Sequence, residues 1–266
     1  MKARDEMMQR LMITALLLAI SGLGPRASSA EPAKLAFDID SGCFACPLIV
    51  SIPKGKYKAA RFVVNGKEVK RWEMSVPFVL SLDEAKIGEL PEGWVAAKTG
   101  EGPGSVWKVL EDATAPHGTK VLAQTSDQGP NRVFNLCIAN KSNFSDLDLV
   151  VAFKAVQGKL DQGGGLVWRY KDVNNYYIAR MNPLENNYRL YKVVAGKRIQ
   201  LGTVDIKIPS KTWHTLRVLH NADRIQCFLD GKLYFDVKDD TFPNAGKIGL
   251  WTKADAQTYF ADLQAK

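Results

Sequence analysis

From residue 148 onward, hydrophobic and polar residues alternate in short runs that are separated by turn residues. A period of two is typical of strands that bury one face, and no sustained helical period interrupts it. The runs predicted as strands are residues 148–153, 166–170, 175–181, 188–193, 198–204, 213–219, 224–229, 232–237, 248–251 and 258–263. Many short strands broken by turn residues predict an all-β sandwich or barrel.

The alternation also predicts which side chains face the core. In one run, Leu216 and Val218 are expected inside and Arg217 outside. In the next run, Ile225 and Cys227 are expected inside for the same reason. The chain is long enough to bury a large core between two such layers.

After its first thirty residues, the chain divides into two segments. Residues 31–84 form a small β-rich N-terminal region in which Asn65-Gly66 is a strong hairpin signal, although its size is marginal for an independent domain. Residues 85–266 hold the main series of strands, with a second hairpin turn at Asp230-Gly231. The main β-sandwich is therefore expected over residues 85–266.

Residues 1–30 have the pattern of a secretory signal peptide. Lys2 and Arg4 precede an apolar run at residues 11–20, and small residues lead up to Ala30, where cleavage is expected. The run is shorter than the ~20 apolar residues that a membrane span needs. We expect a secreted or periplasmic protein with no membrane span after cleavage, and a retained membrane anchor is the alternative.

The charge of the chain is mildly basic. The net charge is +8, and residues 1–30 carry four basic and two acidic side chains, so their removal leaves about +6. The surplus is spread along the chain without the run of Lys and Arg that marks a nucleic-acid groove. No nucleic-acid partner is expected, and weak affinity for anionic polymers stays open.

The cysteines form one close pair and two isolated residues. Cys43 and Cys46 are spaced for a disulfide in an exported protein, with free thiols or a redox or metal role as the alternatives. Pro47 and the β-rich residues after it argue against the helix of a thioredoxin-like site. Cys137 and Cys227 are interpreted as buried apolar residues.

Several stretches of the main segment resemble the 3-keto-disaccharide hydrolase domain family. They are residues 102–109, 161–170, 174–177, 213–218, 229–232 and 249–255. The Asn-Tyr-Tyr, Trp-His-Thr and Leu-Asp-Gly-Lys pieces are shared with laminin-G-like and other concanavalin A-like lectin/glucanase modules. The resemblance covers about residues 85–266 and implies a two-sheet jelly roll with one concave face, in exported proteins linked to glycan or glycoside breakdown.

Aromatic and polar residues gather around the Gly-rich run at residues 163–165 and in the strands after it. Sugars present apolar C–H faces rimmed by hydroxyls, which suits aromatic side chains beside Arg, Asn and carboxylate groups. The residues expected to bind a carbohydrate or glycoside are Trp168, Arg169, Tyr177, Arg180, Asn182, Arg189, Trp251 and Lys253. The other interpretation is that these are ordinary strand residues and surface ion pairs.

The catalytic candidates follow from the chemistry of an oxidised sugar. The sequence lacks the Glu-x-Asp-x-x-Glu strand of laminarinase-type enzymes, whose carboxyls lie about 5–5.5 Å apart in the retaining mechanism. A 3-keto sugar needs only a base to remove the acidified C–H proton and a cation to stabilise the enolate. Glu185 or Asp255 is the expected base, with Arg180, Arg169 or Lys253 as the cation.

No cofactor is certain from the sequence. His117, His214 and His220 form no cluster with carboxylates at metal-ligand spacing. Calcium is common in concanavalin-like folds, so calcium or another divalent metal stays open, with Asp262 as a candidate ligand and a solvated turn aspartate as the other interpretation.

Three functions remain open at this stage. The first is an exported protein that binds or processes a glycan or glycoside on the concave face. The second is a 3-keto-glycoside hydrolase or lyase, and the third is a non-catalytic adhesion or scaffold module. The sequence does not fix the sugar, its linkage or the oligomeric state.

Overall fold

The computed structural model describes residues 59–64, 67–73 and 77–266. The chain divides into two compact units, Met1–Val76 and Pro77–Lys266. The predicted signal peptide and the predicted disulfide between Cys43 and Cys46 lie outside the described residues. Within the described residues, no helix has the length and the hydropathy that crossing a membrane requires.

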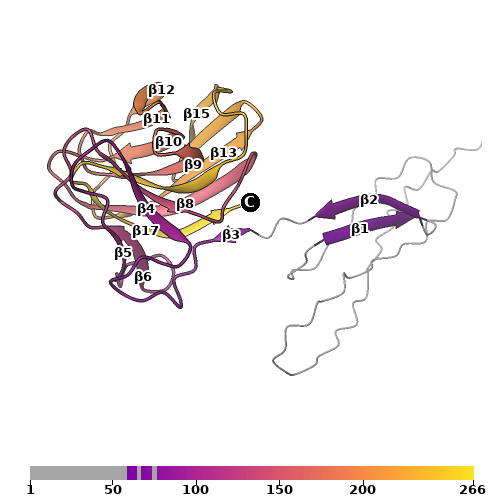
Figure 1. Ribbon diagram of the computed structural model, residues 1–266, viewed down its shortest axis with the longest axis horizontal. Helices are drawn as coiled ribbons and strands as arrows, with labels where there is room; N and C mark the ends of the chain where they lie inside the picture. Colours follow the sequence, from indigo (N-terminus) through magenta and orange to yellow (C-terminus); the bar gives the residue numbers. More distant parts are fainter. Residues whose placement is uncertain (1–58, 65–66, 74–76) are drawn as a thin grey trace, which may run out of the picture. The chain divides into compact units, whose positions relative to one another are not determined.

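In the first unit, the described residues form one β-hairpin. Strands β1 (Ala59–Val64) and β2 (Lys67–Glu73) pair antiparallel, with Val64 opposite Lys67 (Figure 1). This pairing confirms the hairpin predicted around Asn65-Gly66.

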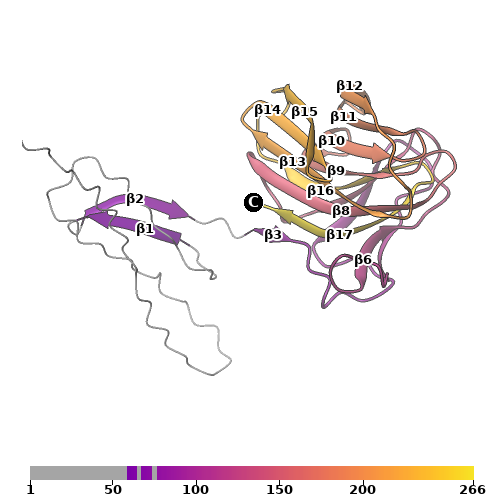
Figure 2. The ribbon, with the colours of Figure 1, turned by 180° about the vertical axis from the view of Figure 1, so that it is seen from behind.

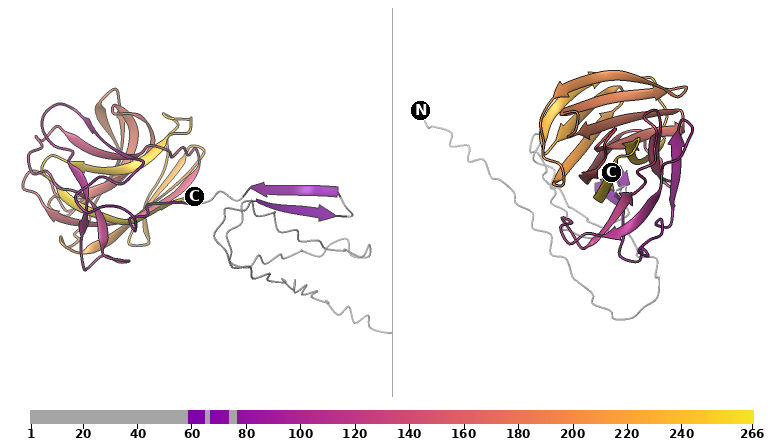
Figure 3. Two further views of the ribbon diagram at one scale, coloured as in Figure 1. Left: turned by 60° about the horizontal axis from the view of Figure 1, so that its bottom comes forward. Right: turned by 90° about the vertical axis from the view of Figure 1, so that its left-hand side faces the viewer.

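The second unit consists of two antiparallel sheets stacked as a sandwich (Figures 1 and 2). One sheet has the order β12-β11-β10-β9-β16-β7-β4, with bounds β4 (Trp94–Thr99), β7 (Phe134–Ala139), β9 (Gly164–Asp172), β10 (Asn175–Asn182), β11 (Asn187–Val194), β12 (Lys197–Asp205) and β16 (Lys247–Lys253). The other has the order β15-β14-β13-β8-β17-β6-β5, with bounds β5 (Trp107–Glu111), β6 (Lys120–Gln124), β8 (Leu147–Gln157), β13 (Trp213–Asn221), β14 (Arg224–Leu229), β15 (Lys232–Lys238) and β17 (Gln257–Ala265). Figure 3 shows the curved layers of the unit from two further directions. The predicted concanavalin-like jelly-roll sandwich is confirmed.

The sandwich begins ahead of the expected boundary at residue 85. The short strand β3 (Phe78–Val79) pairs with β17, and Leu80 and Leu82 are buried in the core. These residues belong to the sandwich because their backbone pairs with β17 and their leucine side chains pack in its core. Every strand predicted from residue 148 onward is present, whereas the sandwich strands before it, β3 to β7, were not predicted individually.

The main core lies between the two sheets. Leu216, Val218, Ile225 and Cys227 are fully buried there, which confirms the faces that the alternation predicted. Cys227 and the equally buried Cys137 are free thiols, as expected of buried apolar residues.

The seven-stranded sheet is also buried over much of its outer face. Leu136, Val167, Ile178 and Trp251 are fully buried and form a second cluster on the side that faces away from the main core. Strand alternation separates this cluster from the core, because it places neighbouring residues on opposite faces. Side chains and turns that lie over this second cluster therefore have a packed layer to support them.

His220 on β13 is buried in the main core as a neutral imidazole. Its Nδ1 accepts a hydrogen bond from Trp168 Nε1 at 2.9 Å, and the ring of Tyr177 lies 5.5 Å from the imidazole, centroid to centroid. Burial, together with the nearby Arg169 guanidinium, lowers the pKa of His220 to about 4. The unfolded chain therefore takes up a proton at this residue that the folded chain excludes.

This difference predicts a loss of stability in mild acid. As the pH falls from about 6.5 to about 4, the free energy of unfolding should decrease by up to about 3 kcal/mol through His220 alone. His220→Asn keeps an acceptor for Trp168 and removes the titration, so its stability should fall less over this range. Urea unfolding at several pH values measures the difference, with the exposed His117 replaced by Gln as the control. Parallel curves for the wild type and His220→Asn would contradict the assignment.

Candidate functional site

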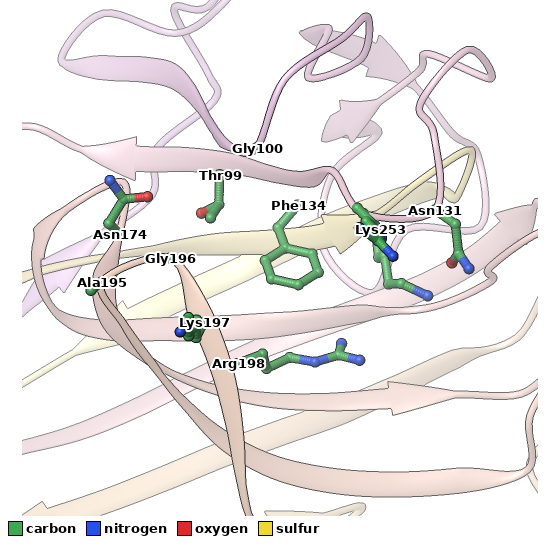
Figure 4. A pocket seen from close by; sticks show the side chains of 11 residues that line it. Thr99, Gly100, Asn131, Phe134, Asn174, Ala195, Gly196, Lys197, Arg198 and Lys253 are labelled. Atoms are coloured by element: carbon green, nitrogen blue, oxygen red, sulfur yellow. The ribbon is translucent and has the colours of Figure 1, made fainter.

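A depression of about 580 Å³ lies over the outer face of the seven-stranded sheet (Figure 4). Lys253 on β16, Phe134 on β7 and Thr99 on β4 sit opposite one another across three neighbouring strands and form its floor. The residues that line the depression are Thr99, Gly100, Asn131, Arg132, Phe134, Asn174, Ala195, Gly196, Lys197, Arg198 and Lys253. The lining therefore combines one aromatic ring, two amides and four cations.

Two hairpin turns build one side of the depression. Asn174 lies in the β9–β10 turn, and Ala195 and Gly196 form the β11–β12 turn, where both residues have positive φ. The backbone N–H of Gly196 donates to the carbonyl of Asn174 at 3.0 Å, so the two turns are fixed side by side. The β11–β12 turn then carries Lys197 and Arg198 into the lining.

Arg198 is held by aromatic rings. Its guanidinium carbon lies 4.4 Å from the ring centroid of Tyr191 and 5.1 Å from that of Phe134. Figure 4 shows Arg198 next to Phe134, with Lys253 beside them. Such cation–π contacts are strongest where the cation is shielded from water. The stack therefore fixes the guanidinium over the floor, and Phe134 in turn packs on Trp251 at 5.5 Å between centroids.

A buried carboxylate supports Lys253. Asp161 is 1% exposed, accepts from Lys253 Nζ at 3.0 Å and accepts from Asn182 Nδ2 at 3.0 Å. Burial raises the pKa of Asp161, although Arg180 and Lys253 act in the opposite direction. This pair places the Lys253 ammonium at the edge of the depression in a fixed position.

Arg180 lies on the same outer face and is neutralised there. Its guanidinium donates to Glu185 at 2.7 Å and to Asn187 at 2.8 Å, and Arg189 approaches Glu185 at 3.5 Å. Burial opposes ionisation of Glu185, but the bonds from Arg180 outweigh it and hold the pKa of this carboxyl below its usual value. Gly165 lies opposite Arg180, and a Cβ there would come within 2.8 Å of the Arg180 Cβ.

The outer face brings together five of the predicted site residues. They are Arg180, Asn182, Glu185, Arg189 and Lys253. Trp251 shares this face but is fully buried beneath its neighbours, so its ring supports the floor and cannot stack on a sugar. Replacing it would open a cavity in the second cluster rather than remove a ligand contact.

Three other predicted residues are directed elsewhere. Trp168 and Tyr177 stack at 5.5 Å within the main core, because their positions in β9 and β10 have the inward parity. Arg169 has a φ of 45° and donates to the carbonyls of Ser145, Phe242 and Ala222, which are away from the depression. These three side chains are therefore not available to a ligand in the depression.

Asp255 is occupied by the backbone. Its carboxylate accepts from the N–H groups of Lys159, Leu160 and Asp161 at 2.6 to 3.1 Å. Burial acts against its ionisation, but these bonds hold the pKa of Asp255 below its usual value. A carboxylate bound in this way is a poor base, and its evident task is to fix the loop that carries Asp161.

Sequence reasoning did not single out several residues of the site. They are Asn131, Arg132, Asp161, Asn174, Lys197 and Arg198. One available signal for Lys197 and Arg198 was the short turn between the predicted strands 188–193 and 198–204. A hairpin turn lies at the exposed end of two strands, where its flanking residues can contact a ligand. The position of Arg132 beside this turn depends on contacts between distant parts of the chain.

No metal site stands out in the described part of the chain. Among those residues, no group of three or more His, Cys, Asp or Glu side chains is arranged to hold an ion. Asp262, the candidate calcium ligand, is within 2.7 Å of His117 Nδ1. A calcium requirement therefore stays a prediction without a site.

Comparisons with known proteins agree with this architecture. A family model described as a 3-keto-alpha-glucoside-1,2-lyase-like domain matches residues 59–266. A carbohydrate binding module, CBM66, from Bacillus subtilis is 20% identical with a TM-score of 0.52, over 65% of this chain and 95% of that one. The cellulose induced protein Cip1 is 11% identical with a TM-score of 0.49, over 71% and 96% of the two chains. At its identity the CBM66 module supports the fold alone, and no curated protein matches the sequence.

The role of Asp255 as an anchor leads to a prediction. Asp255→Asn removes the charge and turns one acceptor into a donor that faces backbone N–H groups, so the free energy of unfolding should fall by about 2 kcal/mol. Amide hydrogen exchange at Lys159, Leu160 and Asp161 should become faster. Asp236→Asn, which breaks an exposed ion pair with Arg224, is the control and should lower the free energy of unfolding much less than Asp255→Asn does. Unchanged exchange in Asp255→Asn would contradict the anchor.

Proposed function

The chain belongs to the family of 3-keto-alpha-glucoside-1,2-lyase-like domains, and from this membership we propose that it binds a glycan or glycoside in the depression over the seven-stranded sheet. The family resemblance drawn from the sequence is thereby confirmed. The observation that carries the proposal is the lining of the depression, where Phe134, two amides and four cations converge from separate strands and turns.

The lining suits the groups that a sugar presents. Asn131 and Asn174 are exposed at the rim, and each amide offers both donors and an acceptor for hydroxyl groups. Phe134 is 8% exposed and contributes a small apolar surface to the floor, and Lys253 provides a fixed donor beside it. A few convergent polar groups around an apolar floor are typical of small-molecule sites.

The place of action is part of the same proposal. We infer that the protein works outside the cytoplasm, because residues 1–30 have the basic start, apolar run and small-residue end of a signal peptide. A secreted or periplasmic protein meets glycans directly.

A second candidate function is lysis of a 3-keto-glycoside, which the family description favours. The ketone at C3 acidifies the proton on C2, and a base that takes this proton lets a C1–C2 double bond form as the C1–O bond breaks. The departing sugar oxygen then takes up a proton. Glu185 is partly exposed on this face and is the base in this scheme, while Lys253 stabilises the negative oxygen.

Binding is tested at the rim of the depression. Asn131→Ala and Asn174→Ala should each weaken binding to a saccharide identified on a glycan array by about three- to tenfold, because each removes hydrogen bonds to hydroxyls. Both side chains are exposed, so the melting temperature should not change. Asn221→Ala, exposed at the end of β13, is the control. Unchanged affinity in both rim variants would place the site elsewhere, and a wild type that retains no glycan would favour the scaffold function.

Catalysis is tested with an oxidised disaccharide such as 3-keto-trehalose, with and without a chelator. Elimination should release glucose together with an unsaturated 3-keto sugar, which becomes a 3-keto monosaccharide if water adds. Glu185→Gln should lower the rate by at least about a hundredfold, the usual contribution of a general base. Glu111→Gln on β5 is the control. A wild type that binds the substrate without releasing glucose would leave binding as the function.

A further inference from the structure

The depression carries an excess of positive charge. Arg132, Lys197, Arg198 and Lys253 line it, and no Asp or Glu is part of the lining. Lys253 is paired with Asp161, but none of the other three has an ion pair within the residues that the structure describes. Three cations therefore converge on this space without a neutralising carboxylate from the described chain.

Arg198 is the most constrained of these cations. Its guanidinium lies against Tyr191 and Phe134, and its Nη1 atom is buried without a hydrogen-bond partner among the described residues. A buried donor without a partner is unfavourable, so such a group is normally matched by an acceptor. Stacking on the aromatic rings holds the guanidinium plane, which leaves its edge to present parallel N–H donors.

The same sheet face shows how the fold treats a cation that it keeps for itself. Arg180 is 1% exposed, and Asn187 and Glu185 accept from its two Nη atoms, although its Nε is also buried without a partner among the described residues. Lys253 has Asp161 in the same way. Arg198 lacks such an internal partner in the described chain although it lies close to these pairs, so its acceptor is expected from outside.

We propose that the saccharide bound in the depression is acidic and that a uronate carboxylate binds the Arg198 guanidinium. This inference rests on the proposed function and names its ligand class. A carboxylate matches the planar fork of Arg through two parallel N–H···O bonds. The remaining ring stays on the Phe134 side, while Lys197 and Arg132 add attraction from the rim.

The test compares a carboxylated ligand with its neutral twin. The full-length protein is titrated with an oligogalacturonate and with the same oligomer as its methyl ester, by calorimetry at low and moderate salt. The wild type should bind the free acid at least about tenfold more tightly, and the preference should shrink as salt rises. Arg198→Gln should remove the preference, so that the free acid and the methyl ester bind with similar affinities.

Two further variants serve as a charge control and as a second test of the site. Arg224→Gln removes one positive charge from the exposed surface of β14 and should preserve the preference. Lys197→Gln is exposed at the rim and should reduce the preference by a few fold without affecting folding, so it carries the test if Arg198→Gln is unstable. An equal loss in Arg224→Gln would show general charge attraction and would overturn the proposal.

The remaining outcomes separate this proposal from the function beneath it. If both oligomers bind equally and Arg198→Gln changes neither, the acidic ligand is wrong while saccharide binding stands. If a sulfated oligosaccharide binds more tightly than the uronate, with the preference lost in Arg198→Gln, the carboxylate assignment is overturned. If no saccharide of either kind binds, the proposed function fails as well.

Discussion

The alternation of side chains along each strand of the seven-stranded sheet is the constraint on which the site depends. Because the central strands of this sheet are buried on both faces, most of their residues belong either to the main core or to the layer beneath the depression. Tyr177 and Arg180 are close in sequence and both deeply buried, yet one supports the sandwich and the other belongs to the site face. A shift of one residue in strand pairing would exchange these roles.

Electrostatics on this face follow from burial. Asp161, Lys253, Arg180 and Glu185 form short ion pairs in a region with little water, where an unpaired charge is costly. Asp255 holds the loop that supplies Asp161, so a carboxylate outside the depression determines where a lysine inside it stands. Arg198 differs because it contacts aromatic rings and no carboxylate of the described chain, and its charge therefore stays in the depression.

The fold was largely predictable from the sequence, and the site only in part. Strands such as β13 and β14 alternate clearly because one of their faces is polar, whereas β7 is buried at all of its positions and so shows no alternation. The density of polar residues predicted Arg180 and Asn182 as site residues, and both lie on the outer face of the seven-stranded sheet. Trp168 and Tyr177 were assigned to the ligand because composition does not reveal which face a strand residue occupies. Arg198 contacts Phe134 on β7 only in the folded chain, and no local sequence pattern predicts this contact.

The two hairpin turns beside the depression have a consequence for divergence among related chains. Asn174 and Lys197 sit on exposed turns, while Trp251 and Ile178 beneath them are fixed by packing. Substitutions in the turns change which ligand the depression recognises and cost little stability, whereas substitutions of the packed residues destabilise the whole sandwich. Related chains can therefore diverge in ligand specificity while they keep the same sandwich core.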